Sequence, residues 1–301
     1  MVLKRIVLII SLPILSMGIF GCNIKPKEKR IENNQYILIQ DISYGDDYRQ
    51  RYDIVLPKTK IIEHGLFLGI HGGAWVSGDK KVYRDQIIDY ATKYGMVTAA
   101  LDYRYANYKN IHYEEILSDI ASCIASIDAV SRKNGFVLNK MITSGASAGG
   151  HLSLLYSYSH QKTSIIRPVA AISYCGPTDL NDPSFYNQKD EKFRKQIREV
   201  IEKVSGTNIE DGISEEEKSV LNDASPVKYV TSDTVPTLFG HGTIDDTVPY
   251  SNALSLKDLL DQNSIKNDFI TFNNSGHGLD NDQTASELMD EKIAEYFELL
   301  K

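Results

Sequence analysis

Cysteine and clustered positive charge are scarce in this 301-residue sequence. Its three cysteines are Cys22, Cys123 and Cys175, and none belongs to a Cys-x-x-Cys pair or to a histidine cluster with metal-ligand spacing. The 33 Lys and Arg residues are outnumbered by 40 Asp and Glu, so the net charge is −7 and the long-range field repels nucleic acid. We therefore expect no metal site and no nucleic-acid partner, and we interpret Cys123 and Cys175 as small buried residues.

Internal repeats and long linkers are missing as well. Hydrophobic residues make up 42% of the chain and charged residues 24%, which is typical of a globular protein and not of a disordered or multi-spanning membrane protein. Domains of the α/β class often reach about 250 residues as one unit. We therefore expect residues 35–301 to form a single domain.

The one pronounced apolar run, residues 6–20, follows Lys4 and Arg5. It is short for a membrane span and is interrupted by proline and serine, so residues 1–21 are typical of a secretory signal. The run ends in Ile-Phe-Gly followed by Cys22, which resembles a bacterial lipobox, and we expect Cys22 to receive a lipid. The alternative is an ordinary cleaved signal with an incidental cysteine, which would make the protein secreted or periplasmic.

Residues 22–34 are polar, basic and without hydrophobic periodicity. This composition predicts a tether between a lipid anchor and the folded domain. The expected location is therefore the bacterial cell envelope, with the membrane contacted only through the anchor.

Short apolar runs alternate with helical patterns along the rest of the chain. We expect strands at 36–44, 51–56, 66–71, 96–103, 141–144, 169–174, 235–240 and 269–272, and helices at 82–94, 111–133, 148–158, 251–262 and 286–300. This alternation predicts an α/β fold with a mostly parallel central sheet and helices on both faces. Catalytic groups should then gather at the carboxyl ends of the strands.

The segment 181–223 interrupts this alternation. It is too long for a plain connection between strands, it includes a polar helix at 191–204, and it should form a small polar cap. A lid that docks on lipid would need a broad apolar face, which the composition does not indicate.

The strongest chemical motif is Gly-Ala-Ser-Ala-Gly at 145–149, where an expected strand ends and a helix begins. This arrangement predicts a nucleophile elbow, in which small residues let the strand turn sharply and Ser147 exposes its hydroxyl. The alternative is a tight glycine-rich turn without chemistry. Upstream, His71-Gly72-Gly73-Ala74-Trp75 follows another strand, and we expect the backbone N–H groups of Gly73 and Ala74, with that of Ala148, to form an oxyanion hole.

A general base and an acid should follow the nucleophile in the order serine, acid, histidine. Among the seven histidines, His277 alone follows an acid at a late strand end, in a Ser-Gly-His-Gly turn. Asp245 and Asp246, after the strand at 235–240, both qualify as the acid that orients the imidazole, and Asp179 is a third candidate. His241 is expected to position this loop.

These motifs, in this order over about 240 residues, resemble α/β-hydrolase esterases of the hormone-sensitive-lipase-like and carbohydrate-esterase kind. The resemblance rests on residues 71–75, 102–104, 145–150, 176–179, 225–226, 241–249 and 275–278. It implies Asp245 as the acid, from the pattern His-Gly-x-x-Asp-x-x-Val-Pro, and activity on acetyl-xylan, feruloyl or short aryl esters with no metal or organic cofactor. Ala74 departs from the third glycine of many lipase-like members and is more similar to the carbohydrate-esterase and kynurenine-formamidase branches.

Four functions remain open on these grounds. The leading prediction is a serine hydrolase that cleaves short-acyl or carbohydrate-linked carboxylic esters through an acyl-enzyme. An amidase or arylformamidase would share the machinery, and so would a peptidase, although prolyl oligopeptidases normally carry a propeller domain. The fourth possibility is a non-catalytic binding lipoprotein that keeps only the fold. Such a protein would not need the complete set of serine, acid and histidine that this sequence contains.

Overall fold

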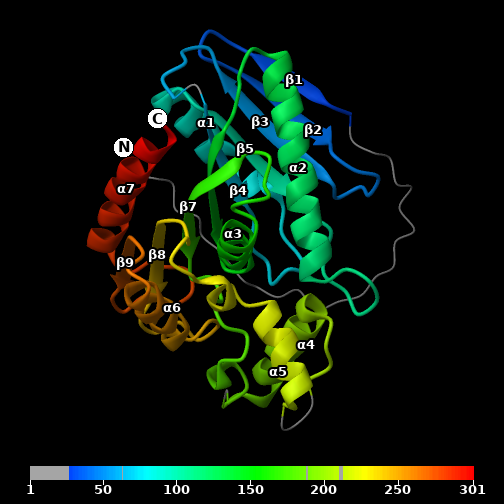
Figure 1. Ribbon diagram of the computed structural model, residues 1–301, viewed down its shortest axis with the longest axis vertical. Helices are drawn as coiled ribbons and strands as arrows, with labels where there is room; N and C mark the ends of the chain where they lie inside the picture. Colours follow the sequence, from blue (N-terminus) through cyan, green and yellow to red (C-terminus); the bar gives the residue numbers. More distant parts are fainter. Residues whose placement is uncertain (1–26, 63, 188, 210–212) are drawn as a thin grey trace.

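The computed structural model describes residues 27–62, 64–187, 189–209 and 213–301, and its core is a nine-stranded sheet in the order β1-β2-β3-β5-β4-β6-β7-β8-β9 (Figure 1). The strands are β1 Lys29–Glu32, β2 Tyr36–Ser43, β3 Arg51–Pro57, β4 Gly65–Ile70, β5 Val97–Asp102, β6 Lys140–Ala146, β7 Arg167–Tyr174, β8 Thr237–Gly242 and β9 Asn267–Phe272. The helices are α1 Arg84–Tyr94, α2 Tyr113–Lys133, α3 Ala148–Ser159, α4 Glu191–Ser205, α5 Glu215–Asp223, α6 Tyr250–Gln262 and α7 Gln283–Phe297. Short 3₁₀ helices are η1 Lys80–Tyr83, η2 Pro183–Phe185, η3 Pro226–Tyr229 and η4 Glu298–Leu300.

The sheet is antiparallel at one edge and parallel elsewhere. Strands β1, β2 and β3 pair antiparallel, and β3 pairs antiparallel with β5. Every later pair, from β5–β4 to β8–β9, is parallel. Parallel neighbours require crossover connections, which the helices supply. This is the α/β-hydrolase architecture that the sequence predicts.

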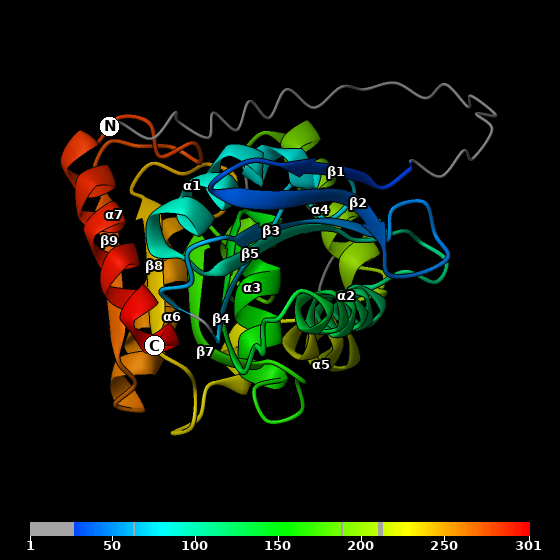
Figure 2. The ribbon, with the colours of Figure 1, turned by 90° about the horizontal axis from the view of Figure 1, so that it is seen from above.

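Helices cover both faces of the sheet (Figure 2). Side chains of α1 and α7 share one apolar cluster, whereas those of α2 and α3 share another and α6 packs beside α3. Strand β4 supplies both faces, because Leu66 and Leu68 pack in the α2–α3 cluster and Phe67 packs between α1 and α7. Alternate residues of a strand point to opposite faces, so its unbroken apolar run suits a strand that is buried on both sides.

One element differs from the prediction for residues 22–34. Lys29–Glu32 forms strand β1 at the edge of the sheet, so these residues are not part of a tether. All four of its side chains are exposed, and backbone pairing with β2 holds it. It has no hydrophobic alternation because no side of it is buried, and the sequence pattern therefore misses it.

The insertion 181–223 folds mainly as α4 and α5, which lie together at one end of the molecule, beyond α2 and α3 (Figure 1). The prediction of a polar segment is incomplete. Side chains of α4 at three- and four-residue spacing face inward and join the α2–α3 cluster: Ile197, Val200, Ile201 and Val204. Nδ1 of His112, at the start of α2, lies 2.9 Å from the carbonyl oxygen of Lys203, which fixes the insertion to the main domain.

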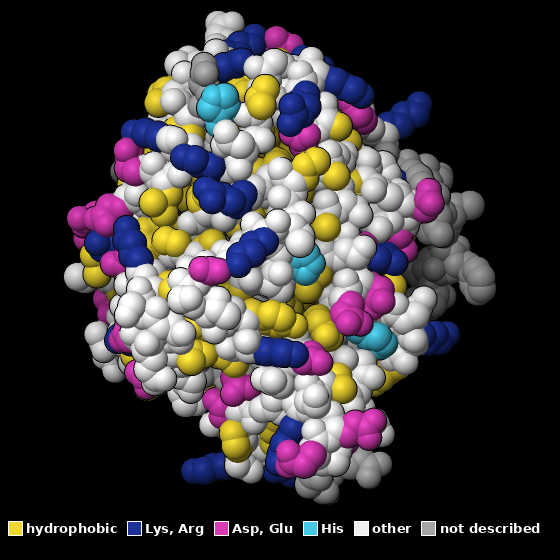
Figure 3. Space-filling model, viewed as in Figure 1, with side chains coloured by type: hydrophobic (Ala, Val, Ile, Leu, Met, Phe, Trp, Pro, Cys, Tyr) yellow, Lys and Arg dark blue, Asp and Glu magenta, His cyan; other side chains and the backbone are white. Residues whose placement is uncertain are grey.

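Cys123 and Cys175 are both buried and both free, in agreement with their interpretation as small core residues. Residues 1–21, which we expect to be a secretory signal, and Cys22 lie outside the described residues. Within the described part of the chain, no helix is both long enough and apolar enough to cross a membrane. Lys, Arg, Asp and Glu side chains are interspersed over the face seen in Figure 3.

Candidate active site

Four neighbouring strands end at the same edge of the sheet. Ala146 on β6 is in register with Tyr174 on β7, Tyr174 with Gly240 on β8, and Gly240 with Ile270 on β9. The loops after β6, β8 and β9 carry the serine, acid and histidine that the sequence singles out. Parallel pairing thus brings three distant parts of the chain to one edge, as expected for an open α/β sheet.

Ser147 occupies the sharp turn between β6 and α3. Its φ and ψ angles are 56° and −126°, a strained conformation for a residue with a side chain. Its backbone N–H donates to the carbonyl of Tyr174 at 2.7 Å, which supports the turn from the next strand. A Cβ atom at Gly149 would lie 2.0 Å from the carbonyl oxygen of Ile70, so α3 can start this close to β4 only without a side chain there. These are the properties of a nucleophile elbow.

The segment from His71 to Gly78, which we call the oxyanion loop, lies against this elbow. A Cβ atom at Gly72 would lie 3.4 Å from Cβ of Ser147. Gly73, Ala74 and Trp75 have φ angles of 105°, 50° and 60°.

Three backbone donors in this region are free. No hydrogen bond among the described residues uses the N–H of Gly73 or Ala74. Ala148 is the first residue of α3, so its N–H has no acceptor within the helix. The residues predicted as oxyanion donors therefore have N–H groups available to a ligand.

His277 and Asp245 are in direct contact. Nδ1 of His277 lies 2.8 Å from Oδ2 of Asp245, and both side chains are buried, with 8% and 0% of their surface exposed. The turn that carries His277 is fixed to the acid loop, because the N–H of Ile244 donates to the carbonyl of Ser275 at 3.1 Å. Of the other acids considered, Asp246 is exposed and pairs with Thr247.

The carboxylate of Asp245 is surrounded by donors. Its Oδ1 accepts the N–H groups of Thr247 and Val248, both at 2.9 Å, and Nε2 of His241 lies 3.3 Å from Oδ2. Burial alone would raise the pKa of Asp245, but the hydrogen bonds of His241 and His277 outweigh burial and hold that pKa well below its usual range. The carboxyl group of Asp245 is therefore ionised near neutral pH.

The atoms that would react are both unengaged. Nε2 of His277 is buried and has no hydrogen-bond partner among the described residues. Within the part of the chain that the structure describes, the hydroxyl of Ser147 forms no hydrogen bond either, and the residue is 7% exposed. The structure does not join these two atoms to each other by a hydrogen bond. Catalytic contacts of this kind often close only when substrate binds.

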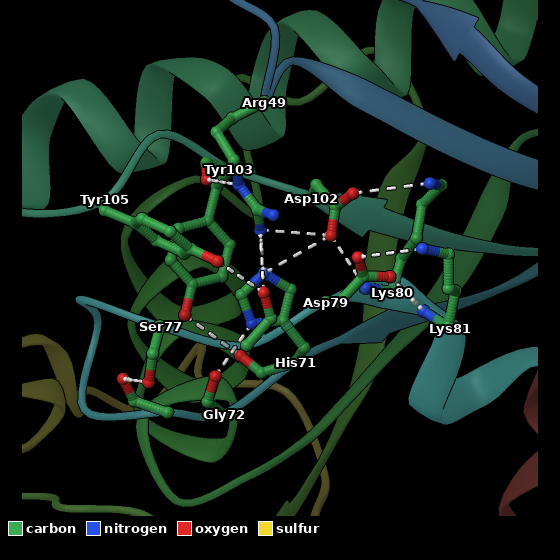
Figure 4. Close-up of polar contacts among 12 residues, drawn as sticks. Arg49, His71, Gly72, Ser77, Asp79, Lys80, Lys81, Asp102, Tyr103 and Tyr105 are labelled. Atoms are coloured by element: carbon green, nitrogen blue, oxygen red, sulfur yellow. Dashed lines mark hydrogen bonds and ion pairs between the residues drawn. The ribbon is translucent and has the colours of Figure 1, made fainter. Parts of the chain in front are cut away.

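Two further histidines support the site from behind. His71 is stacked on Tyr103, with ring centroids 4.3 Å apart, and its Nδ1 lies 2.7 Å from the carbonyl oxygen of Gly72 (Figure 4). Burial lowers the pKa of His71 to about 3, the contact with Gly72 opposes that effect, and the charge of Arg49 adds to it. His71 is thus neutral, and its 3.6 Å distance from Asp102 is not an ion pair.

His151, on the first turn of α3, connects the oxyanion loop to Ala224, the residue directly after the insertion 181–223. Its Nδ1 accepts from the indole N–H of Trp75 at 3.2 Å, and its Nε2 lies 2.7 Å from the carbonyl oxygen of Ala224. Burial lowers its pKa to about 4, so it too is neutral. The His151 side chain is therefore fixed at both ring nitrogens, with Nδ1 as the acceptor and Nε2–H as the donor.

Cys175, His241 and Asp245 form a buried group whose possible metal-ligand atoms lie within 4.8 Å of one another. His241 lies 2.9 Å from the carbonyl oxygen of Val248, as well as beside Asp245. Burial raises the pKa of the Cys175 thiol, so the thiolate that a metal would need is disfavoured. We interpret the group as internal support for Asp245.

Sequence reasoning missed Arg49, which reaches into this region from the β2–β3 connection. It is one arginine in a polar loop and belongs to no motif, so no sequence signal marks it. The sequence presents His151 only as one of seven histidines that could be the general base, and Cys175 only as a small buried residue. Their roles depend on which atoms of other loops they contact, which a single sequence does not reveal.

The mostly parallel sheet, the elbow after β6 and the acid and histidine loops after β8 and β9 define an α/β hydrolase. A family model named BD-FAE matches residues 52–260. The chain belongs to the BD-FAE family of α/β-hydrolase esterases. His277 lies beyond the matched segment.

Individual relatives agree with this assignment. The chain is 26% identical over 261 residues to the esterase LipC of Mycobacterium tuberculosis (strain ATCC 25618 / H37Rv), an alignment that covers 83% of this chain and 62% of LipC. A truncated form of a carbohydrate esterase from gut microbiota has the same fold, with a TM-score of 0.68, 19% identity and coverage of 88% of this chain and 99% of that one. Esterase B from Lactobacillus rhamnosis (HN001) gives a TM-score of 0.71, 17% identity and coverage of 89% and 86%.

Proposed function

We propose that this protein hydrolyses carboxylic esters through an acyl-enzyme, with Ser147 as nucleophile, His277 as general base and Asp245 as the acid that orients it. One observation carries the proposal. The imidazole of His277 is fixed on Asp245 through Nδ1, while its Nε2 is buried, without a partner in the described part of the chain, at the sheet edge where the strained Ser147 lies.

In the first step, Oγ of Ser147 attacks the carbonyl carbon of the ester while Nε2 of His277 takes the hydroxyl proton. The imidazolium that forms is stabilised by the anionic carboxylate of Asp245. The negative oxygen of the tetrahedral intermediate accepts hydrogen bonds from the N–H groups of Gly73, Ala74 and Ala148.

Collapse of this intermediate breaks the bond between carbon and the alcohol oxygen, and His277 returns its proton to the leaving alcohol. The acyl group then remains on Ser147. Water, activated by the neutral imidazole, attacks the acyl carbon, and a second collapse releases the carboxylic acid and restores the serine.

The substrate class that we propose is short-acyl or carbohydrate-linked esters. The similarity to a carbohydrate esterase and to esterase B supports it at the level of the fold, and Ala74 in the oxyanion loop supports it at the level of the motif. An amidase, arylformamidase or peptidase would use the same groups.

A panel of 4-nitrophenyl esters from acetyl to octanoyl, acetylated xylan, 4-nitroacetanilide and an N-formyl arylamine would separate these activities. Fastest turnover of a short or carbohydrate ester is expected, and a clear preference for an amide would overturn the substrate class.

We also propose that the protein is a lipoprotein of the bacterial cell envelope, with the lipid on Cys22. The proposal rests on the apolar run 6–20 and the lipobox-like residues before Cys22. Strand β1 begins at Lys29, so a tether to an anchor at Cys22 would comprise residues 23–28.

A further inference from the structure

The oxyanion loop has a backbone conformation that needs support. Its residues 73–75 all have left-handed φ angles, and Gly78 has a φ of 107°. Each residue with a side chain costs on the order of 1 kcal/mol or more in this region, so such a segment persists only where surrounding contacts fix it. Within the loop, the N–H groups of Val76 and Ser77 donate to the carbonyl of Gly73 at 3.1 and 2.9 Å, and further contacts come from outside the loop.

Arg49 joins the two ends of the loop, and Figure 4 shows its guanidinium beside His71. Its Nη2 lies 3.0 Å from Nε2 of His71, at the start of the loop, and donates to the carbonyl of Gly78, at the end, at 3.1 Å. One guanidinium group thus contacts residues that are seven positions apart and closes the base of the loop.

The contact with Arg49 also determines where the proton of His71 lies. A guanidinium can only donate, so Nε2 of His71 accepts and the proton is on Nδ1. Nδ1–H then donates to the carbonyl of Gly72 at 2.7 Å. That carbonyl and the N–H of Gly73 belong to one planar trans peptide, in which the two point in opposite directions. Binding the Gly72 carbonyl to His71 therefore directs the Gly73 N–H away from His71, toward the other side of the loop.

Arg49 is itself held rigidly. Its Nη2 donates to Oδ1 of Asp102 at 3.1 Å, its Nε donates to the carbonyl of Tyr103 at 3.3 Å, and its guanidinium lies 4.2 Å from the ring centroid of Tyr105. Lys80 provides a second cation for Asp102, with its Nζ 3.3 Å from Oδ2. A planar group with several donors fits this set of acceptors, and a lysine ammonium would not.

We infer that Arg49 is a positioning residue for the oxyanion hole. It binds both His71 and Gly78, and by fixing the tautomer of His71 it orients the peptide group that carries the Gly73 N–H. This inference rests on the proposed esterase function. Arg49 itself touches neither the serine nor the histidine of the triad, so its effect should be confined to stabilisation of the oxyanion.

The test compares R49M and R49K with R104M. Arg104 is a matched control because it binds a buried carboxylate, that of Asp119, at 2.7 Å and has no contact with the oxyanion loop among the described residues. For 4-nitrophenyl acetate, R49M should lower kcat about 10- to 100-fold and change KM by less than about threefold, because the lost interactions act in the transition state. Labelling of Ser147 by an alkyl phosphonate, which forms an oxyanion-like adduct, should slow by a similar factor.

R49K should remain within about fivefold of R49M, because an ammonium cannot bridge the same acceptors. R104M should change kcat less than about threefold. The inference is overturned if R49M and R104M lose kcat equally, if the loss in R49M is confined to KM, or if R49K restores full activity.

A spectroscopic readout separates failure of this inference from failure of the proposed function. In ¹⁵N-histidine-labelled wild-type protein, His71 should be neutral and protonated at Nδ1, and R49M should lose this single-tautomer signature. An unchanged tautomer in R49M would overturn the inference even if the protein were no esterase. A wild-type protein that turned over no ester would overturn the proposed function alone.

Discussion

Asp245 and His277 share a hydrogen bond of 2.8 Å between Oδ2 and Nδ1, in a place where neither side chain is more than 8% exposed. The other carboxylate oxygen of Asp245 accepts two backbone N–H groups of its own loop. These two backbone hydrogen bonds fix the orientation of the carboxylate independently of the imidazole. This arrangement leaves Nε2 as the only ring atom of His277 that can take a proton from a substrate or a nucleophile.

Asp245→Asn should lower kcat by up to about 10⁴-fold with little change in KM. An amide cannot hold His277 in the tautomer whose Nε2 accepts a proton. Asp246→Asn is the matched control, one residue away and exposed, and should retain activity within about threefold. Steady-state kinetics on a chromogenic ester measures both. A mild effect of Asp245→Asn together with a severe effect of Asp246→Asn would show that the acid is assigned to the wrong residue.

The buried neutral histidines predict acid sensitivity of the fold. Burial lowers the pKa of His71 to about 3 and that of His151 to about 4, whereas a histidine in the unfolded chain has a pKa of about 6.5. Between these values the unfolded state binds more protons than the folded state. The free energy of unfolding should therefore fall as the pH drops below about 6.5, with a slope that approaches about 1.4 kcal/mol per pH unit for each of the two residues.

Denaturant unfolding between about pH 5.0 and 6.5, where surface carboxylates stay ionised, measures this slope. The variant His151→Gln keeps a polar side chain but does not titrate, so its slope should be smaller than that of the wild type by nearly the share of one histidine. Equal slopes in the two proteins would contradict the assignment of His151 as a buried neutral group.

The close approach of α3 to β4 makes Gly149 intolerant of a side chain. In Gly149→Ala the new methyl would lie 2.0 Å from a backbone oxygen, which must move, and we expect a loss of about 2 kcal/mol or more in the free energy of unfolding together with lower activity. Gly278→Ala is a stability control, because its nearest neighbours lie 3.8 Å away or more. Urea unfolding of both variants tests the prediction, and equal stability would mean that the elbow is less tightly packed than described.

The sequence predicts the central part of this fold well, because its signals are local. The apolar stripe of α2, from Ile116 to Ile127, follows directly from helical periodicity, and β4 and β5 follow from short unbroken apolar runs. The elbow is equally local, since Ser147 and its small neighbours are adjacent in the chain. Strand β1 is the counterexample, because an exposed edge strand depends on backbone pairing and carries no side-chain pattern.

The candidate site is predictable only in part, for the same physical reason. Chain order and chemistry indicate His277 and two adjacent aspartates, and only the resemblance to a family pattern favours Asp245. The contact that distinguishes Asp245 from Asp246 is made between loops 32 residues apart. Arg49 reaches His71 across 22 residues and belongs to no motif. The inward face of α4 is different, because Ile197, Val200 and Val204 recur at helical spacing in the sequence; the expectation of a polar cap followed the overall composition of the segment and not this periodicity.

Lipid attachment at Cys22 predicts a membrane-bound protein. Expressed in a bacterium with its own N-terminus, the wild type should partition into the membrane fraction and incorporate labelled palmitate. Cys22→Ser should lose the label, whereas Cys123→Ser, a change at a buried cysteine, should keep it. Release of an unlabelled wild-type protein cleaved at another residue would contradict the proposal.

The most direct test of the account is the chemistry of Ser147. When the wild type is stopped in acid during turnover of a 4-nitrophenyl ester, or treated with an alkyl phosphonate, mass spectrometry should find the acyl or phosphonyl group on Ser147. Ser147→Ala should lower kcat by about 10⁴-fold or more while thermal unfolding stays near that of the wild type. Near-normal turnover by Ser147→Ala, or a label on another residue, would contradict the central claim.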